Sequence, residues 1–441
     1  MPSLAFVPPP AERAVGLGFY ITDTPGVPGT TKTSPEEFRV SEISSYPLPD
    51  SSGTYTVLRI VSRGWEQHEL GSALARELGL PPHAIAWSGT KDRRAVAERL
   101  ASYRGPPPNH AVSLPGVEIV ESYRARDGLV LGHHYGNAFE IHVVPSETTP
   151  QSAATSYAAT EAALRSAGGF PNFFGPQRFG EVRPITHAVG RALVQGDPAD
   201  AVEIYLTAIP PGTVAGRGDD ARVAYAGHRD PARALREMPV DYRFERTLLE
   251  RLARGQDAAQ ALRGLSRDLR LLFVHAYQSY LFNRWLCERR TAGLPLTSPV
   301  PGDRVLRIGR DGSYRSQDGV PVDTDNLREC VELVARGGAL VAGPLVGFET
   351  PVEPGPVGGL LDQLLREEGV DRVGFRVPFA PEISSKGAWR PLVLPLPPIA
   401  REFDPTGTWF KFALPKGAYA TVLLREFLKV GATAGSAPRG G

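Results

Sequence analysis

The period of the apolar residues changes twice along the chain, and this change limits the folds that the chain can adopt. Apolar and polar residues alternate over 37–44 and 55–61, which is typical of strands. Between about 185 and 292 the apolar residues follow a helical period, with the longest helix expected at roughly 266–291. Strand-like alternation returns at 407–414. We therefore predict a mixed α+β protein whose sheet-forming part is interrupted by a helix-richer insertion.

The composition narrows the class of protein further. Hydrophobic residues make up 41% of the 441 residues, which is enough for a globular core, and no apolar run is long enough to predict a membrane span. The two cysteines, Cys287 and Cys330, form neither a disulfide framework nor a CxxC metal motif, so a reducing cytoplasm is the expected location. The net charge of +1 does not by itself indicate a nucleic-acid partner. One short stretch is nevertheless strongly basic, with Lys91, Arg93, Arg94, Arg99 and Arg104.

The segment SGTKDRRAVAERLAS, residues 88–102, places an acid within this basic stretch. We predict a short strand at 84–87, a corner at Gly-Thr-Lys-Asp and then a helix that ends near Ser102. Asp92 at this corner has two interpretations. On pattern alone, capping of the helix is the more common role. Alternatively, the basic neighbours would keep the carboxylate ionised at neutral pH, and an ionised Asp is a competent nucleophile for a sugar or ring carbon.

A second motif, NFFGPQRFG at 172–180, also has two interpretations. Its three aromatic residues and two glycines fit a buried turn. Asn172, Gln177 and Arg178 among aromatic rings also suit the stacking and edge hydrogen bonding of an unstacked nucleotide. The residues alone leave both interpretations open.

A helical stripe runs through HAYQSYLFNRWLCERR at 275–290. Tyr277, Leu281 and Trp285 recur at helical spacing, and we expect them in the core. Gln278 and Asn283 lie beside the stripe, where we expect them to fix loops rather than contact a ligand.

Motifs that would indicate other chemistries are missing from the sequence. The nine histidines form no HExxH pair, and no GxSxG or GxGxxG segment occurs. GVPGTTKT at 26–33 is similar to a phosphate-binding loop but has Thr31 where that loop requires glycine. We therefore expect no metal and no nucleotide cofactor.

The motifs together resemble the TruD family of tRNA pseudouridine synthases. GTKDRRAV, NFFGPQRFG, AYQSYLFN and LPKGAYAT…LLREF occur in the family's order, and KTSPEEFRVSE has Lys32, Phe38 and Glu42 at the family's spacing. The resemblance runs from about residue 26 to 429, and the chain length is similar to that of archaeal members. It implies a pseudouridine synthase core with a mixed, largely antiparallel sheet, interrupted by an inserted TRUD domain. The expected parts are 1–169 and 396–429 for the core, 170–395 for the insertion and 430–441 for a disordered tail.

The resemblance also implies a role for individual residues. Asp92 is expected to be the catalytic carboxylate and Lys32 its ionic partner. Phe38 and Tyr419 are expected to flank the uracil ring, and Asn172 to bind its edge. The remaining residues expected to contact the substrate are Phe174, Gln177, Arg178 and Lys91. The implied partner is tRNA, modified at position 13 by a monomer without metal or cofactor.

The sequence departs from the family pattern at two places. Ala97 and Arg99 stand where many relatives have Thr and Gln, and Glu66-Gln67 replaces the more common Asn-Thr pair. Two other classes of function are compatible with parts of the pattern. A non-catalytic RNA-binding module would not need Asp92, and a nucleoside glycoside hydrolase also uses carboxylates but releases free uracil.

Overall fold

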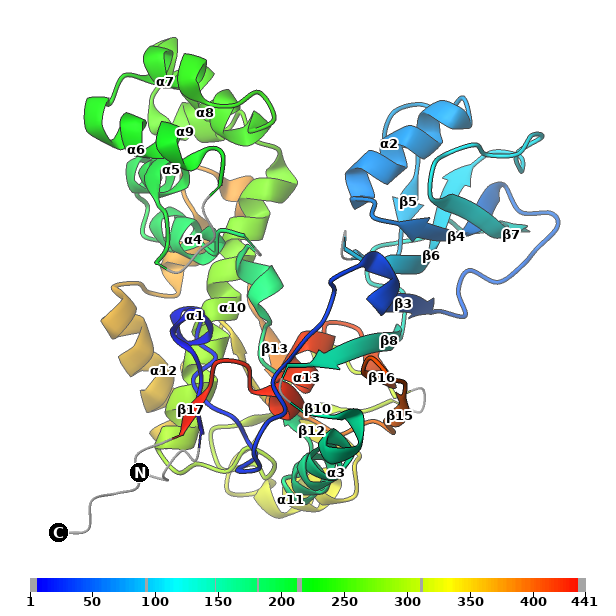
Figure 1. The fold of residues 1–441 in the computed structure, drawn as a ribbon. Coiled ribbons are helices and arrows are strands. Elements are labelled where there is room, and N and C mark those ends of the chain that lie inside the picture. The colour runs from blue at the N-terminus through cyan, green and yellow to red at the C-terminus, as the bar shows by residue number, and fades with distance from the viewer. Residues whose placement is uncertain are drawn as a thin grey trace. The chain divides into compact units, whose positions relative to one another are not determined.

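The computed structural model describes residues 6–91, 94–146, 148–180, 182–211, 216–309 and 312–434. The chain divides into two compact units, each made of separate stretches of sequence (Figure 1). We call one the sheet unit, which comprises Thr24–Ala167 and Pro395–Val430. The other, the helical unit, comprises Met1–Asp23, Gly168–Leu394 and Gly431–Gly441.

A nine-stranded sheet forms the body of the sheet unit, with the order β15-β16-β8-β3-β6-β4-β7 and the short strands β2 and β5 attached to β8 and β6. Among the described strands of this sheet, only β3 and β6 pair in parallel, and the other pairings are antiparallel. The predicted mixed, largely antiparallel sheet is therefore confirmed. The strands are β2 (Gly29–Thr30), β3 (Phe38–Ile43), β4 (Tyr55–Arg63), β5 (Ala86–Trp87), β6 (Val96–Arg104), β7 (Val117–Ala125), β8 (Gly136–Pro145), β15 (Ala400–Phe403) and β16 (Thr408–Pro415).

One secondary-structure prediction at the centre of this sheet is wrong. The segment expected to be a helix ending near Ser102 is strand β6, which lies between β3 and β4. Its alanines, Glu98 and Leu100 favour a helix locally, but helix propensity is a weak preference that tertiary context overrides. Here both edges of the segment pair with neighbouring strands. Its side chains are buried on both faces of the sheet.

Helices cover one face of the sheet at two places. α2 (Gln67–Glu77) packs Leu70 and Leu74 against Leu58, Ile60 and Ala101 of the central strands. α3 (Pro150–Ser166) and α13 (Ala420–Leu428) cover the other end of the sheet. There the Phe410 ring of β16 lies 4.9 Å from that of Tyr157 and 5.4 Å from that of Phe427, measured between centroids.

The helical unit is organised around α10 (Arg267–Thr291), which confirms the predicted long helix. Tyr277, Leu281 and Trp285 are at most 1% exposed, so the helical stripe is core. Gln278 donates to the Val346 carbonyl and to Ser385 Oγ (2.5 and 2.8 Å), and thus fixes loops, as expected. The other helices are α1 (Pro10–Ala14), α4 (Thr186–Val194), α5 (Pro198–Thr207), α6 (Asp219–His228), α7 (Pro231–Glu237), α8 (Arg243–Ala253), α9 (Ala258–Leu262), α11 (Leu327–Ala335) and α12 (Gly355–Glu368).

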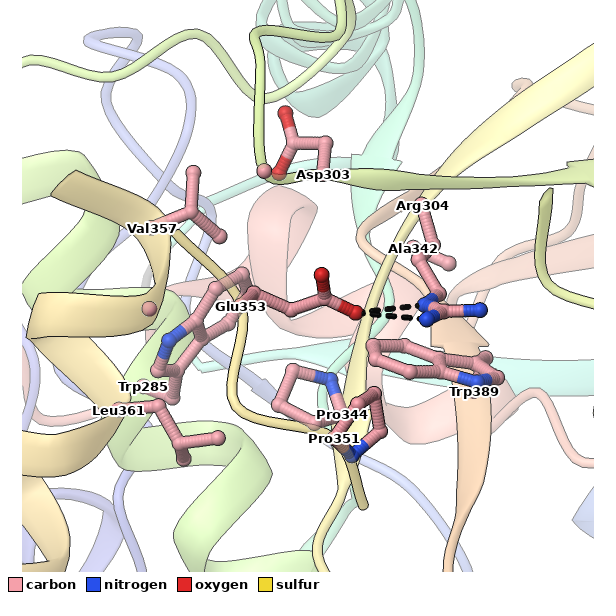
Figure 2. A pocket seen from close by; sticks show the side chains of 12 residues that line it. Trp285, Asp303, Arg304, Ala342, Pro344, Pro351, Glu353, Val357, Leu361 and Trp389 are labelled. Carbon is pink, nitrogen blue, oxygen red and sulfur yellow. Dashed lines mark hydrogen bonds and ion pairs between the residues drawn. The ribbon is translucent and has the colours of Figure 1, made fainter. Parts of the chain in front are cut away.

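A four-stranded sheet, β11-β10-β12-β13, packs beside α10 in this unit. A narrow pocket lies where this sheet meets α10 and α12, and Figure 2 shows the Arg304–Glu353 ion pair (2.8 Å) within it. The Arg304 guanidinium also lies 4.8 Å from the centroid of the Trp389 ring, so its charge is held by a carboxylate and an aromatic face. The strands are β10 (Arg304–Arg307), β11 (Val320–Pro321), β12 (Ala339–Leu345) and β13 (Ala388–Pro391).

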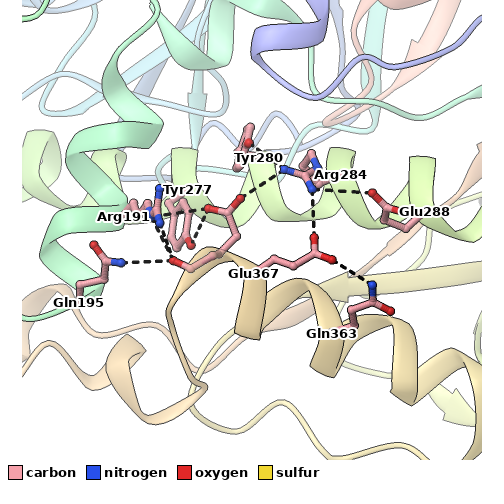
Figure 3. A network of polar contacts seen from close by, with 9 residues as sticks. Arg191, Gln195, Tyr277, Tyr280, Arg284, Glu288, Gln363 and Glu367 are labelled. Atoms are coloured by element: carbon pink, nitrogen blue, oxygen red, sulfur yellow. Dashed lines mark hydrogen bonds and ion pairs between the residues drawn. The ribbon is translucent and has the colours of Figure 1, made fainter.

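The C-terminal end of α12 is fixed to α4 and α10 by a polar network (Figure 3). The Glu368 carbonyl accepts hydrogen bonds from Arg191 Nε and Nη2 at 3.1 and 2.8 Å. Its carboxylate accepts from Tyr277 Oη at 3.4 Å and pairs with Arg284 at 3.3 Å. Because the last carbonyls of a helix have no partner within it, the Arg191 guanidinium supplies donors to one of them, while Arg284 pairs with the side-chain carboxylate.

The division of the chain differs from the sequence-based one at the N-terminus, because Met1–Asp23 belong to the helical unit. There β1 (Phe6–Val7) pairs with β17 (Thr433–Ala434), within the stretch expected to be a disordered tail. Residues 435–441 lie outside the described part of the chain. None of the helices in that described part has the length and apolar character that crossing a membrane requires.

The contact between α4 and α10 generates a testable prediction at Gly190. A Cβ atom there would lie 2.0 Å from the Phe273 carbonyl oxygen and 2.9 Å from Tyr277 Cβ. We expect Gly190→Ala to lower the free energy of unfolding by about 2 kcal/mol, because the backbones must separate. The matched control is Gly227→Ala on α6, which meets no atom within 4 Å and should be neutral or up to about 1 kcal/mol stabilising. Urea unfolding followed by tryptophan fluorescence would compare the two variants, and equal stabilities would contradict the prediction.

Candidate active site

The predicted catalytic residue, Asp92, lies outside the described residues, as does Arg93. The structure therefore describes the residues on either side of Asp92 and Arg93. The chain from 94 to 104 contains strand β6 and no helix. The alternative that Asp92 caps a following helix is therefore wrong, while its catalytic role stays a prediction.

Strand register places a row of polar side chains across the sheet next to this segment. Glu42 of β3 lies directly opposite Asn137 of β8. The parallel pairing of Ser41 with Glu98 puts Arg99 of β6 next to Glu42 on its other side. Opposed residues in paired strands project from the same face, so Asn137, Glu42 and Arg99 share one face of the sheet.

Glu42 and Lys91 form a buried ion pair in this row. Lys91 Nζ lies 3.1 Å from Glu42 Oε2, and the two side chains are 2% and 1% exposed. Ser88 Oγ, also buried, donates to the other carboxylate oxygen of Glu42. Burial lowers the pKa of Lys91, and the Glu42 carboxylate opposes this shift. Lys91 was expected to contact the substrate; here its ammonium has an internal partner, and its substrate contact stays a prediction.

The backbone that leads to Lys91 is fixed from a second side by His134. His134 Nδ1 hydrogen-bonds the Ser88 carbonyl at 2.9 Å. A Cβ atom at Gly89 would lie 2.7 Å from His134 Cε1, so the glycine allows this close approach. Burial and the Lys91 charge lower the pKa of His134, which keeps the imidazole neutral near pH 7. Residues 88–91 are thus anchored on side chains from β3 and from the residues just before β8.

Arg99, one of the departures from the family pattern, is 1% exposed in the same row. Its Nη2 donates to Ser62 Oγ at 3.3 Å, whereas Nε and Nη1 have no hydrogen-bond partner among the described residues. Burial lowers its pKa to about 10, opposed by the Glu42 and Glu66 carboxylates. Glu66, the other departure, accepts from the backbone N–H groups of His68 and Glu69 at 2.8 and 3.1 Å and so caps α2. The two departures are therefore electrostatically coupled.

Aromatic rings form the next row of the sheet. Phe139 of β8 lies 6.1 Å from Phe38 of β3 and 5.7 Å from Phe412 of β16, measured between ring centroids. Lys32 Nζ lies 4.0 Å above the Phe38 ring, so the structure brings these two predicted residues together. Tyr419 precedes α13 as its N-cap residue and is half-buried.

The other predicted substrate residues belong to the helical unit. Asn172 is 1% exposed, donates through Nδ2 to the Pro391 carbonyl at 3.0 Å and accepts from Arg390 Nη2 at 2.7 Å. The same guanidinium lies 3.9 Å from the centroid of the Phe174 ring. Asn172 is therefore part of a buried network. A hydrogen bond from its amide to a base would have to replace one of these two hydrogen bonds.

Asn283 of α10 holds the backbone of the same motif. Its Oδ1 accepts from the Phe174 N–H at 2.8 Å, and its Nδ2 donates to the carbonyls of Phe174 and Val15 at 3.0 Å each. Gln177 and Arg178 lie in a short 3₁₀ helix, Pro176–Phe179, and both are half-buried. Arg178 Nε donates to Ser279 Oγ at 3.1 Å. The sequence analysis expected Asn283 to fix a loop, and this is confirmed.

Glu42 and Asn137 of the sheet row were not predicted as site residues, although the sequence pattern carried a signal for Glu42. In FRVSE the alternation places Glu42 on the face of Phe38 and Val40, where a core residue is expected. A carboxylate in a core position indicates a buried partner. Asn137 gives no comparable signal, because its neighbour Glu42 is 95 positions earlier in the numbering and is known only from the register.

The buried ion pair generates a stability prediction. Glu42→Gln leaves the Lys91 ammonium buried without its counter-charge, so we expect a loss of about 3–5 kcal/mol in the free energy of unfolding. The double variant Glu42→Gln/Lys91→Met removes both charges and should recover most of this loss. Urea unfolding of the three proteins checks the prediction, and a double variant no more stable than Glu42→Gln would contradict it.

The NFFGPQRFG motif generates a prediction about pH. His187 packs its ring edge-on to Phe179 and stacks on Tyr280, with centroids at 5.4 and 4.8 Å. Burial lowers its pKa from 6.5 to about 4. Between these pH values the unfolded chain binds a proton that the folded chain does not, so stability falls as the pH falls. His187→Phe keeps the ring and should reduce the loss of Tm between pH 7 and 5, whereas the exposed His68→Phe should not.

Comparisons with known proteins agree with this architecture. The family model described as tRNA pseudouridine synthase D (TruD) matches residues 14–427. The probable tRNA pseudouridine synthase D of Halobacterium salinarum is 38% identical over 437 residues, covering 95% of this chain and 98% of the relative. That of Methanococcoides burtonii is 34% identical, with 96% and 98% covered. The crystal structure of the putative TruD from Methanosarcina mazei superposes with a TM-score of 0.78 at 32% identity, covering 96% of this chain and 98% of that one.

Proposed function

The chain belongs to the tRNA pseudouridine synthase D (TruD) family, and on this premise we propose that Asp92 is the carboxylate with which it isomerises a uridine of tRNA. The activity is that of an isomerase, a tRNA pseudouridine synthase. We place the target at position 13 of the tRNA and expect the protein to act as a monomer in the cytoplasm.

The reaction conserves every atom of the nucleotide. The C1′–N1 bond breaks, the base turns and a C1′–C5 bond forms. In the proposed sequence the Asp92 carboxylate bonds to C1′ as the electron pair of the glycosidic bond leaves with N1. C5 of the turned base then attacks C1′ and releases the carboxylate, after which C5 loses its proton and N1 gains one. Because no redox change or group donor is involved, the reaction needs no cofactor.

The observation that carries the proposal is the anchoring of the residues directly before Asp92. Lys91 is held by Glu42 at 3.1 Å, and the Ser88 carbonyl is held by His134 at 2.9 Å. Consecutive Cα atoms are about 3.8 Å apart, so an anchored Lys91 restricts where the next residue begins. Catalysis by a carboxylate depends on such preorganisation. A displaced nucleophile is neither within reacting distance of the carbon that it attacks nor correctly aligned with it.

We also propose roles for the other predicted site residues. We propose that Lys32, 4.0 Å above Phe38, keeps Asp92 ionised and oriented. Phe38 and Tyr419 would flank the uracil ring, which must leave its stack to be reached. We also propose that Asn172, Phe174, Gln177 and Arg178 of the helical unit contact the tRNA substrate.

The catalytic assignment predicts the behaviour of Asp92→Asn. The variant should bind tRNA with nearly unchanged affinity but form no measurable pseudouridine, because the amide cannot act as the nucleophile. Release of tritium from C5-labelled uridine measures the activity, and filter binding measures the affinity. Asp268→Asn, with a side chain that is 83% exposed, is the matched control and should keep full activity.

The same assay distinguishes the proposal from its rivals. A glycoside hydrolase would release free uracil, visible by chromatography, and a binding module would bind tRNA without tritium release. An active Asp92→Asn protein would refute the assignment.

A further inference from the structure

Two arginines at the start of α10 are oriented by backbone carbonyls rather than neutralised by carboxylates. Arg263, the C-cap residue of α9, donates from Nη2 to the Phe379 carbonyl at 3.1 Å. Arg267, the first residue of α10, donates from Nε to the Glu382 carbonyl at 2.9 Å. Each contact uses one of the several N–H donors of a guanidinium, and a neutral carbonyl does not cancel its charge. Both side chains are therefore oriented while their positive charge stays uncompensated.

The acids close to these arginines leave them positively charged. The Glu382 carboxylate is paired with Arg270, whose side chain is 9% exposed. Among the ion pairs of the described residues, none includes Arg263. Asp268, with a side chain that is 83% exposed, lies 3.9 Å from Arg267, and solvent screens an exposed pair of this kind. The start of α10 therefore keeps a net positive charge.

The same side of α10 leads from these arginines to the NFFGPQRFG motif. Arg267, Leu271, His275 and Ser279 recur at every fourth position, so they are neighbours along one side of the helix. Ser279 Oγ accepts from Arg178 Nε of the motif at 3.1 Å and donates to the His275 carbonyl at 2.7 Å. Arg267 and Ser279 are about 18 Å apart along the helix axis, at about 1.5 Å per residue. Cations therefore stand at both ends of this side of the helix.

His275 lies between these cations and responds to both. It is half-buried, and burial lowers its pKa from 6.5 to about 4, with further lowering by the charges of Arg178 and Arg267. No acidic residue occurs in the sequence from 269 to 279. A positive potential thus extends along this side of α10, where it attracts a ligand with several negative charges. We call Arg178, His275, Arg267 and Arg263 the α10 strip.

We propose that the α10 strip binds successive phosphates of the tRNA strand that carries the target uridine. The inference rests on the proposed function and adds to it a surface that holds the RNA backbone. A guanidinium presents a planar fork of donors that matches the oxygens of a phosphate. Arginines spaced along one rigid helix can therefore follow a single strand.

The residues between the cations indicate that this contact is independent of base sequence. Leu271 and Leu272 are apolar, and Leu272 is 37% exposed, so neither can read the hydrogen-bonding edge of a base. Contacts to phosphates fix the register and orientation of a nucleic acid without reading its sequence. The α10 strip would therefore align the RNA, while selection of the uridine depends on other residues.

The experiment measures how the binding of an unmodified tRNA transcript depends on salt. Phosphate contacts release counterions, so the logarithm of the affinity falls linearly with the logarithm of the salt concentration. Fluorescence anisotropy at about 50 to 200 mM KCl gives this slope. Arg263→Gln/Arg267→Gln should weaken binding roughly tenfold and reduce the slope by about 1 for each arginine. Arg263→Lys/Arg267→Lys keeps both charges and should retain most of the wild-type slope.

The matched control is Arg328→Gln on α11, which removes the charge of a side chain that is 94% exposed. It should leave the affinity and the slope unchanged. At saturating tRNA the double glutamine variant should form pseudouridine with the wild-type kcat but a raised KM, because the α10 strip holds the RNA without reacting with it.

The possible outcomes separate this inference from the proposed function. Wild-type affinity and slope in the double glutamine variant would overturn the inference, leave the proposed function intact and indicate another occupant, such as an acidic protein. Equal losses in the lysine and glutamine variants would also overturn it, because charge would then not be the cause. Reduced slopes together with a wild-type protein that forms no pseudouridine would support the inference and overturn the proposed function alone.

Discussion

The buried ion pair between Glu42 and Lys91 is the interaction on which the candidate site depends. It joins strand β3 to the residues directly before Asp92, although the two segments are far apart in sequence. A buried pair costs desolvation of both charges, which is recovered only when other hydrogen bonds complete the site. Here Ser88 supplies one of them, and His134 holds the Ser88 backbone in turn. The pair therefore matters less as a source of stability than as a link that fixes Lys91 to β3.

The parallel pairing of β3 with β6 determines which side chains lie next to this ion pair. It is the one parallel pairing in an otherwise antiparallel sheet among the described strands. It sets Glu42 beside Arg99, and the antiparallel contact with β8 sets Asn137 on the other side of Glu42. A polar row and an aromatic row thus result from register alone, on a face otherwise packed with apolar side chains. The chemistry of the site follows from which strands are neighbours.

The elements that could be predicted from the sequence are those whose signals lie within one segment. The helical stripe of Tyr277, Leu281 and Trp285 predicted α10 and its buried face, because helical periodicity is a property of one segment. The prediction of a helix at β6 was wrong for the converse reason: the strand is imposed by its two neighbours, which no local pattern records. Lys32 and Phe38 were predicted and lie together, but Asn137 depends on register and was missed. For Asn172 the sequence pattern indicated a polar contact. It did not show that the side-chain amide is already hydrogen-bonded to Arg390 and to the Pro391 carbonyl.

The completion of the sheet by β16 has a consequence for synthesis of the chain. β8 ends at Pro145 and pairs with β16, which begins at Thr408, so on the order of 260 residues separate the partners. A ribosome that adds about 5–20 residues per second needs on the order of 10–50 s to make the intervening chain. During that time the β16-facing edge of β8 has an exposed row of backbone hydrogen-bonding groups, which favours unwanted pairing with other strands. The nascent chain therefore keeps an unpaired sheet edge throughout the time in which its helical unit is being made.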